Sequence, residues 1–381
     1  MMQIIISSVG TSLLTHQIDR THPDERNWYN LLRDTANLTL ENTPENVKNI
    51  IYILKNRAIE KLNSSSIVQI RDASAELNGI YGFYDNNLTL GKNGNDFHWL
   101  ICTDTLQGKT TGEIVESFLK NNGISSECLI PQGLSTINIS SFSNGIDNLL
   151  TQLENIIYQD KTVKVCFNLV GGFKSLQGYL NTIGMLYADE IIYIFEGKNS
   201  ELIRIPRLPI KVDESIIEPN IIEFALMSQG EISANKIKNI KESLVYIMDN
   251  EATLSNWGKV IWNNCKHKFL TQELLNFPFI KYTSSFINDY NNITLEQEKI
   301  KLQETLAKVS YLLSTNNGNR AVLRNDKALQ YETFNNKSID HFRVTGKNYR
   351  VSCEPTDNNI LLLRYYGTHD HIFRRENIKR N

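Results

Sequence analysis

Residues 165–176 read VCFNLVGGFKSL, an apolar strand that ends at two glycines and continues as a helix. A similar arrangement is found near the amino terminus, where residues 3–13 read QIIISSVGTSL. Glycines let the backbone approach a ligand closely, and backbone N–H groups at such a turn suit an anion. Lys174 in the first helical turn opposes the helix dipole, so an anionic ligand is expected there. Either loop alone also suits an ordinary turn, but together they predict one phosphate-binding crevice at the carboxyl ends of neighbouring strands.

The first two hundred residues alternate short apolar strands with amphipathic helices, the pattern of a doubly wound α/β domain with a mainly parallel sheet. Strands are expected at 3–8, 98–103, 127–130, 163–170, 190–195 and 202–206. Helices are expected at 112–121, 145–158 and 174–187, where apolar residues recur at helical spacing. Residues 23–63 are expected to form a helical insertion after the first strand. The dinucleotide fingerprint GxGxxG with its downstream acid is absent, so a dinucleotide site is not predicted.

The order of elements changes after Pro206 and Pro209. Residues 211–277 are expected to form a helical connector, with helices at 221–227, 236–248 and 257–266. A small α+β domain should close the chain, with helices at 284–291 and 295–313, strands at 329–334, 339–344, 349–354 and 360–366, and a hairpin turn at 355–359. The predicted domains are therefore 1–210, 211–277 and 278–381.

Composition excludes several classes of protein. The 381 residues are 41% hydrophobic, yet no apolar run approaches the roughly 20 residues that span a bilayer, and no apolar leader is present. A cytoplasmic protein without a membrane segment is expected. Five cysteines are scattered singly without a CxxC pair, so reduced, mostly buried thiols are expected.

The charge is distributed unevenly along the chain. From Arg320 onward there are 12 Lys or Arg against 7 Asp or Glu, a net charge of +5 that leaves −7 for residues 1–319. Only this end of the chain suits a polyanion, and the basic residues of 374–380 should add affinity for RNA without specificity.

A second candidate site lies in this basic segment. His341 and Arg343 are two apart on a predicted strand and share a face, Arg350 follows across a turn, and a Gly-Thr-His corner brings in His369. RNA cleavage without metal needs an acceptor for the 2′-hydroxyl proton, a cation for the phosphate and a donor for the leaving 5′-oxygen. Histidine and arginine supply these groups, so these four residues are the candidate catalytic set. No metal site is predicted, because His369 and His371 lack further ligands, and His371 is expected to be structural.

The segments SSVGTSL, NLVGGFKS, ADEIIYIFEG and LIRIPRLPI, spread over residues 1–210, resemble the CARF domain of CRISPR-associated effectors. The resemblance implies a homodimer whose two crevices join into one pocket for a cyclic oligoadenylate, with cyclic tetra-adenylate as the expected ring. The residues that it implies for this pocket are Gly10, Thr11, Ser12, Asn168, Gly171, Gly172, Phe173 and Lys174.

The segments FRVTGKNYRVSCEP and ILLLRYYGTHDHIF, within residues 278–381, resemble the RelE toxins, messenger-RNA interferases that cut in the ribosomal A site. The resemblance implies that Arg350 stabilises the phosphate and that His369 is the catalytic histidine. His341 and Arg343 occupy positions that are often basic in that family. Phe373 stands where some members have a tyrosine, so the hydroxyl of that residue is missing here.

Together these resemblances imply a CARF–RelE fusion, a CRISPR-associated messenger-RNA interferase that needs no metal or other cofactor. A cyclic oligoadenylate would bind across the dimer, shift a conformational equilibrium of the connector, and activate cleavage of ribosome-bound mRNA. Two alternatives stay open. The protein could be a ligand-gated, non-catalytic regulator that binds RNA or the ribosome. It could also be a ring nuclease that linearises its own ligand, with Thr11, Ser12 and Lys174 positioning a phosphate.

Overall fold

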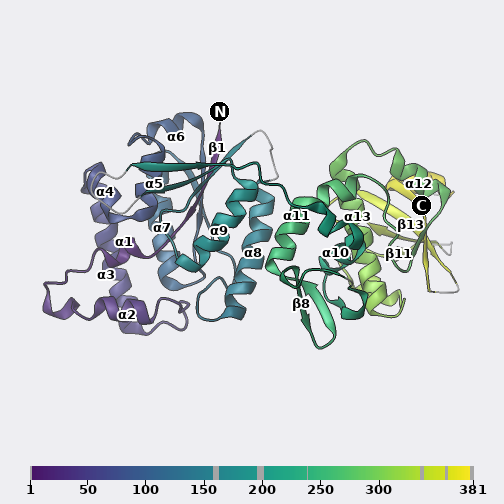
Figure 1. Ribbon diagram of the computed structural model, residues 1–381, viewed down its shortest axis with the longest axis horizontal. Coiled ribbons are helices and arrows are strands. Elements are labelled where there is room, and N and C mark those ends of the chain that lie inside the picture. Colours follow the sequence, from purple (N-terminus) through teal and green to yellow (C-terminus); the bar gives the residue numbers. More distant parts are fainter. Residues whose placement is uncertain are drawn as a thin grey trace. The chain divides into compact units, whose positions relative to one another are not determined.

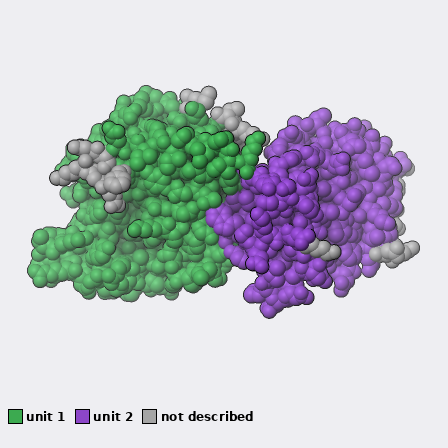
Figure 2. All heavy atoms as spheres, in the orientation of Figure 1, with its two compact units in different colours: residues 1–211 green, residues 212–381 purple. Residues whose placement is uncertain are grey.

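The computed structural model describes residues 2–157, 163–194, 201–237, 239–334, 339–356 and 359–377. The chain divides into two units, residues 1–211 and residues 212–381, shown in different colours in Figure 2. Several sequence-based expectations fall partly outside the described residues. They are the end of the helix at 158, the end of the strand at 195, residue 238 of the helix expected at 236–248, the middle of the turn at 355–359, and the basic tail beyond residue 377.

The first unit is built on a six-stranded sheet with the order β3-β2-β1-β4-β5-β6. Its strands are β1 (Gln3–Ser8), β2 (Phe97–Ile101), β3 (Ser125–Leu129), β4 (Lys164–Asn168), β5 (Glu190–Ile194) and β6 (Leu202–Pro206). All neighbours pair in parallel except β5 and β6. The α/β class with a mainly parallel sheet is therefore confirmed. Because the chain moves outward in opposite directions from β1 and β4, the carboxyl ends of these two strands form the topological switch point, where such sheets bind ligands.

Helices cover both faces of this sheet (Figure 1). They are α1 (Ser12–Thr15), α2 (Trp28–Asp34), α3 (Glu45–Ser64), α4 (Ile67–Ala73), α5 (Ala75–Phe83), α6 (Thr89–Gly94), α7 (Leu106–Asn121), α8 (Ile139–Ile157) and α9 (Lys174–Tyr187). Alternation along β1 buries Ile5 in the cluster formed with α3, α5 and α7, whereas Ile6 is buried outside that cluster. The predicted helical insertion at 23–63 is confirmed as helical, and helices α4 to α6 extend it to Gly94.

The second unit contains a five-stranded sheet with the order β10-β14-β13-β12-β11. Its strands are β10 (Ile280–Tyr282), β11 (Glu332–Thr333), β12 (Asp340–Arg343), β13 (Tyr349–Pro355) and β14 (Leu361–Thr368). Side chains such as Phe342 and Val351 point from one face into a core shared with α12 (Ser284–Asn291) and α13 (Glu296–Thr315). Two shorter helices are α14 (Ala321–Asn325) and α15 (His369–Arg375), the second of which begins directly after β14.

Residues 212–277 contain a small sheet as well as helices. Helices α10 (Ile221–Met227) and α11 (Asn256–Thr271) lie where helices were expected. The expected helix at 236–248 is wrong, because β8 (Val245–Met248) pairs with β9 (Glu251–Leu254), which also pairs with β7 (Ile232–Ser233). Asp249 and Asn250 both have positive φ values, 50° and 68°. Such residues favour a two-residue hairpin turn, and this local preference overrides the helical spacing of the apolar residues.

Candidate functional site

The loops after β1 and β4 meet in one pocket of the first unit. This pocket has a volume of about 420 Å³, within the range of small-molecule sites, about 300–1,000 Å³. Six residues that the sequence proposed for ligand binding line it: Gly10, Thr11, Ser12, Gly171, Gly172 and Phe173. The crevice predicted at the carboxyl ends of these two strands is therefore present.

Close packing explains why these loops contain glycine. The Ser8 hydroxyl donates a hydrogen bond to the Gly171 carbonyl oxygen at 2.6 Å, which ties the end of β1 to the loop after β4. A Cβ atom on Gly10 would lie 3.1 Å from the backbone nitrogen of Gly172. Gly172 itself has φ +99°, and a Cβ atom there would lie 2.8 Å from Ser8 Cβ. The floor of the pocket thus requires a residue without a side chain at position 172.

The Gly172→Ala substitution is expected to lower the free energy of unfolding of the first unit by about 1–3 kcal/mol, because it adds strain at a positive φ value and a clash. Gly178→Ala is the matched control, since Gly178 is an exposed residue of α9 with nothing within 4 Å of an added Cβ. The control should be neutral or up to about 1 kcal/mol more stable. Urea unfolding measures both, and equal stability of the two variants would contradict this account of the loop.

A buried carboxylate, Glu76 of α5, lies beneath both loops and was not singled out from the sequence. Its side chain is 0% exposed, and its Oε1 accepts a hydrogen bond from the Gly10 N–H at 2.6 Å. Its Oε2 accepts one from the Ser74 hydroxyl at 2.7 Å. The N-cap serine signals a helix start in the sequence, but nothing local shows that the carboxylate points inward. Because the Gly10 N–H is already used, an anion in the pocket must be held by other groups.

Two further predicted residues, Asn168 and Lys174, fall outside the described residues that line the pocket. Asn168 is fully buried, and its amide nitrogen donates to the Ser7 hydroxyl and to the Glu76 carbonyl, both at 3.1 Å. Lys174 is exposed at the start of α9. Asn168 is thus a structural residue that links the ends of β1 and β4 to α5 inside the protein. The rest of the pocket wall comes from residues that the sequence did not single out: Thr15, Tyr29, Leu32, Arg33, Ala36, Ala75, Gln107 and Val170.

The second candidate site lies on the face of β12, β13 and β14 opposite the helical core. Arg343 is directly opposite Arg350 on the neighbouring strand, and Arg350 is opposite Gly367. His341 shares this face with Arg343, as the spacing of two predicted. His369 is the first residue of α15, immediately after β14. The structure therefore brings all four candidate residues together: His341 and Arg343 on β12, Arg350 on β13, and His369 at the start of α15.

Arg350 is half-buried, and its Nη1 atom is buried without a hydrogen-bond partner in the part of the chain that the structure describes. Burial, together with the neighbouring Arg343 guanidinium, lowers the pKa of Arg350, and Glu332 offsets this only in part. Arg343 is engaged in the turn that follows its strand, since its Nε donates to the Lys347 carbonyl at 2.8 Å. Of the two arginines, Arg350 is the one prepared to receive an anion.

His341 is buried, 5% exposed, and its ring stacks on Phe334 with centroids 4.0 Å apart. Burial, followed by the charges of Arg350 and His369, lowers the pKa of His341 to about 4. His341 is therefore neutral near pH 7. The Phe373 ring contacts Phe334 at 5.2 Å and His369 at 4.3 Å, so an aromatic cluster links the two histidines.

Neighbouring residues fix α15 against the sheet. The Nε2 atom of His371 lies 3.6 Å from an Asp289 carboxylate oxygen, in line with the structural role expected of this histidine. Glu376, just after α15, accepts hydrogen bonds from the Ser352 hydroxyl at 2.7 Å and from Arg364 Nε at 3.0 Å. These contacts set the position of His369 at the other end of the helix. The sequence did not single out Arg364 or Glu376, because their pairing depends on where α15 docks.

Stability is expected to fall in acid because two histidines are buried as neutral groups. Burial lowers the pKa of His98 to about 3, and His341 has a pKa of about 4. Below pH 6.5 the unfolded chain takes up protons that the folded chain does not, so the free energy of unfolding is unaffected above pH 6.5 and falls as the pH decreases. Each site should cost about 3 kcal/mol by pH 4. Urea unfolding at pH 7 and pH 4 should show a smaller loss for His341→Gln than for wild type, and equal losses would contradict this account.

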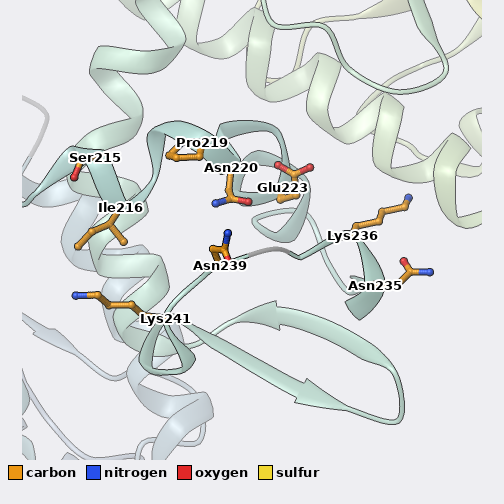
Figure 3. Close-up of a pocket in the computed structure, with 9 residues that line it drawn as sticks. All are labelled: Ser215, Ile216, Pro219, Asn220, Glu223, Asn235, Lys236, Asn239 and Lys241. Atoms are coloured by element: carbon orange, nitrogen blue, oxygen red, sulfur yellow. The ribbon is translucent and has the colours of Figure 1, made fainter.

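A separate hollow of about 610 Å³ lies in the second unit and is lined by nine residues between positions 215 and 241 (Figure 3). The ammonium groups of Lys236 and Lys241 point in opposite directions (Figure 3). The nine lining residues include neither histidine nor cysteine. We therefore do not place chemistry in this hollow.

Within the described ranges, no group of three or more His, Cys, Asp or Glu side chains is arranged to hold a metal ion. The five cysteines form no disulfide, and four of them are buried, as expected. No described helix is long and apolar enough to cross a membrane.

Comparison with known families gives a match over part of the first unit. Residues 71–208 match the model of a family described as CRISPR-associated protein (Cas_APE2256). The matched segment includes Glu76 and the whole loop after β4, but not the loop after β1 or the second unit. Over residues 71–208 the chain is therefore similar to a family of CRISPR-associated proteins.

Proposed function

We propose that this chain is a CRISPR-associated ribonuclease in which the first unit binds a cyclic oligoadenylate and the second unit cleaves messenger RNA on the ribosome. The observation that carries the proposal is the half-buried Arg350, whose Nη1 atom has no hydrogen-bond partner within the described ranges, on a sheet face that also brings in His341 and His369. The family match over residues 71–208 supports the CRISPR context, and the pocket between the glycine loops supports a phosphate-bearing ligand.

The proposed reaction is attack of the 2′-oxygen on the adjacent phosphorus. The new P–O2′ bond forms as the P–O5′ bond breaks, which leaves a 2′,3′-cyclic phosphate and a 5′-hydroxyl. Arg350 offsets the negative charge that develops on the phosphate oxygens. His369 is exposed and donates the proton that the leaving 5′-oxygen takes up, and solvent water accepts the proton of the attacking 2′-hydroxyl. His341 is only 5% exposed, which suits a group that positions its neighbours better than one that reaches the RNA.

Activation is proposed to follow from the first unit acting as a homodimer. Two copies of the pocket would share one ring, and cyclic tetra-adenylate is the ring that we expect. The ligand can shift the equilibrium between inactive and active forms only as far as its affinity differs between them. The net charge of +5 from Arg320 onward suits an RNA partner for the second unit.

The chemistry of the new RNA ends tests this proposal. Ring-activated protein should be incubated with programmed ribosomes, and the upstream fragments should carry 2′,3′-cyclic phosphates while the downstream fragments carry 5′-hydroxyls. His369→Ala should give neither product. Fragments with 5′-phosphates would contradict attack by the 2′-oxygen, because that end arises when water attacks and the 3′-oxygen leaves.

A further inference from the structure

One face of the insertion helix α2 forms a wall of the pocket in the first unit. Tyr29, Leu32, Arg33 and Ala36 all line this pocket. Their spacing of i, i+3, i+4 and i+7 places them on a single stripe of the helix and its end. Figure 1 shows α2 beside α3, within the insertion that follows β1. The insertion therefore contributes a continuous surface to the ligand site of the sheet.

The position of this wall is fixed by contacts with the rest of the unit. Arg57 of α3 pairs with Glu25, just before α2, at 2.7 Å. At the other end, the Gln107 amide of α7 donates to the Leu32 carbonyl at 2.8 Å. The Thr136 N–H donates to Asn37 Oδ1 at 3.0 Å, just beyond the helix. A wall held at both ends is preorganised for a ligand.

The chemistry of the wall matches a nucleotide. Tyr29 is 44% exposed, and the Arg20 guanidinium lies over its ring, 5.5 Å from the centroid. A base that stacks on this ring therefore uses the opposite face or displaces Arg20. The Arg33 side chain is 61% exposed and pairs with Asp34, which is 62% exposed, so a phosphate can compete for its guanidinium. Deeper in the pocket the Ser12 hydroxyl is buried without a hydrogen-bond partner among the described residues. A ring for stacking, a cation and a free hydroxyl are the groups that a base and its phosphate require.

We propose that α2 is the nucleotide-recognition wall of this pocket, with Tyr29 stacking on an adenine base and Arg33 binding the adjacent phosphate. Leu32 and Ala36 supply the apolar surface between these two contacts. The identity of the full ligand as a cyclic oligoadenylate rests on the proposed function, but the wall itself predicts recognition of any adenine nucleotide seated on the glycine loops. This gives the insertion a role in ligand selection.

Isothermal titration of the full-length protein with cyclic tetra-adenylate and, separately, with 5′-AMP tests the proposal. Tyr29→Ala should weaken binding about tenfold or more, as expected for the loss of one stacked base, and Tyr29→Phe should bind like wild type. Arg33→Ala should weaken binding by a similar factor. Tyr52→Ala and Arg26→Ala are matched controls, because both residues are exposed and neither lines the pocket. Both controls should bind like wild type.

The outcomes separate this inference from the proposed function. If wild type binds the ring and the Tyr29→Ala/Arg33→Ala variant, shown to be folded, binds it equally well, the wall is not part of the site and the inference is overturned. If wild type binds 5′-AMP but no ring, and the double variant loses 5′-AMP, the inference holds and the proposed messenger is wrong. If wild type binds neither probe, both are overturned.

Discussion

Replacing Arg350 by methionine is expected to reduce ring-activated RNA cleavage by about 10²–10³-fold or more while leaving the fold intact. Removing one positioned hydrogen-bond donor that stabilises the negative charge of a transition state lowers kcat by a factor of this size. Arg350 is the candidate cation because Arg343, opposite it, is engaged with the Lys347 carbonyl. Arg350→Lys should restore only part of the rate, because an ammonium group cannot grip a phosphate through two parallel hydrogen bonds.

The same substitution should not destabilise the second unit. Arg350 is half-buried, its Nη1 has no hydrogen-bond partner among the described residues, and burial lowers its pKa. The folded state therefore bears the cost of a charge that Glu332 offsets only in part. Arg350→Met should therefore leave the unfolding temperature unchanged or raise it. Cleavage rate and thermal unfolding, measured on the same preparation, check the two halves of this prediction. Full activity of the variant would remove Arg350 from the proposed site.

Replacing Arg364 by methionine is expected to produce the largest loss of stability, about 3–5 kcal/mol. Arg364 donates to Glu376 from both Nε and Nη2, at 3.0 and 3.2 Å, and to Glu354 at 2.8 Å. The Glu376 side chain is 1% exposed, so the substitution removes the paired cation from a buried carboxylate, which keeps the hydrogen bond from the Ser352 hydroxyl. Urea unfolding monitored by circular dichroism measures the loss.

A double variant provides the control for this prediction. Arg364→Met combined with Glu376→Met removes both charges, and replacing a whole buried pair by apolar groups of similar volume is often close to neutral. The double variant should therefore recover most of the stability that the single variant loses. A single-variant loss below about 1 kcal/mol, the value for an exposed pair, would show that the contact is not a buried ion pair.

The regular part of the fold could be predicted because its signals are local. Strand β1, helix α9 and helix α12 have the bounds that apolar spacing predicted. The error at 236–248 arose because Asp249 and Asn250 decide a hairpin only when both adopt positive φ values, whereas apolar spacing alone favoured a helix. Strand β10 was missed because its three residues form a strand only by pairing with β14.

In the candidate sites, too, features with a local signal could be predicted, whereas features that depend on distant residues could not. The meeting of the two glycine loops could be predicted, because parallel strands end at one edge of a sheet. The role of Asn168 inside that edge could not, because its partners Ser7 and Glu76 come from two other elements. Tyr29 and Arg33 were also missed, since the docking of α2 depends on distant residues such as Gln107.

The most direct test of the central claim, ring-gated cleavage of ribosome-bound mRNA, is a translation reaction with purified ribosomes and a defined mRNA. Cyclic tri-, tetra- and hexa-adenylate are added separately, and new 5′ ends are mapped by primer extension. The account predicts in-frame cleavages that appear with one ring size, expected to be cyclic tetra-adenylate, and that are absent with His369→Ala. Absence of cleavage with every ring, despite measurable ring binding, would contradict the nuclease and favour a non-catalytic regulator.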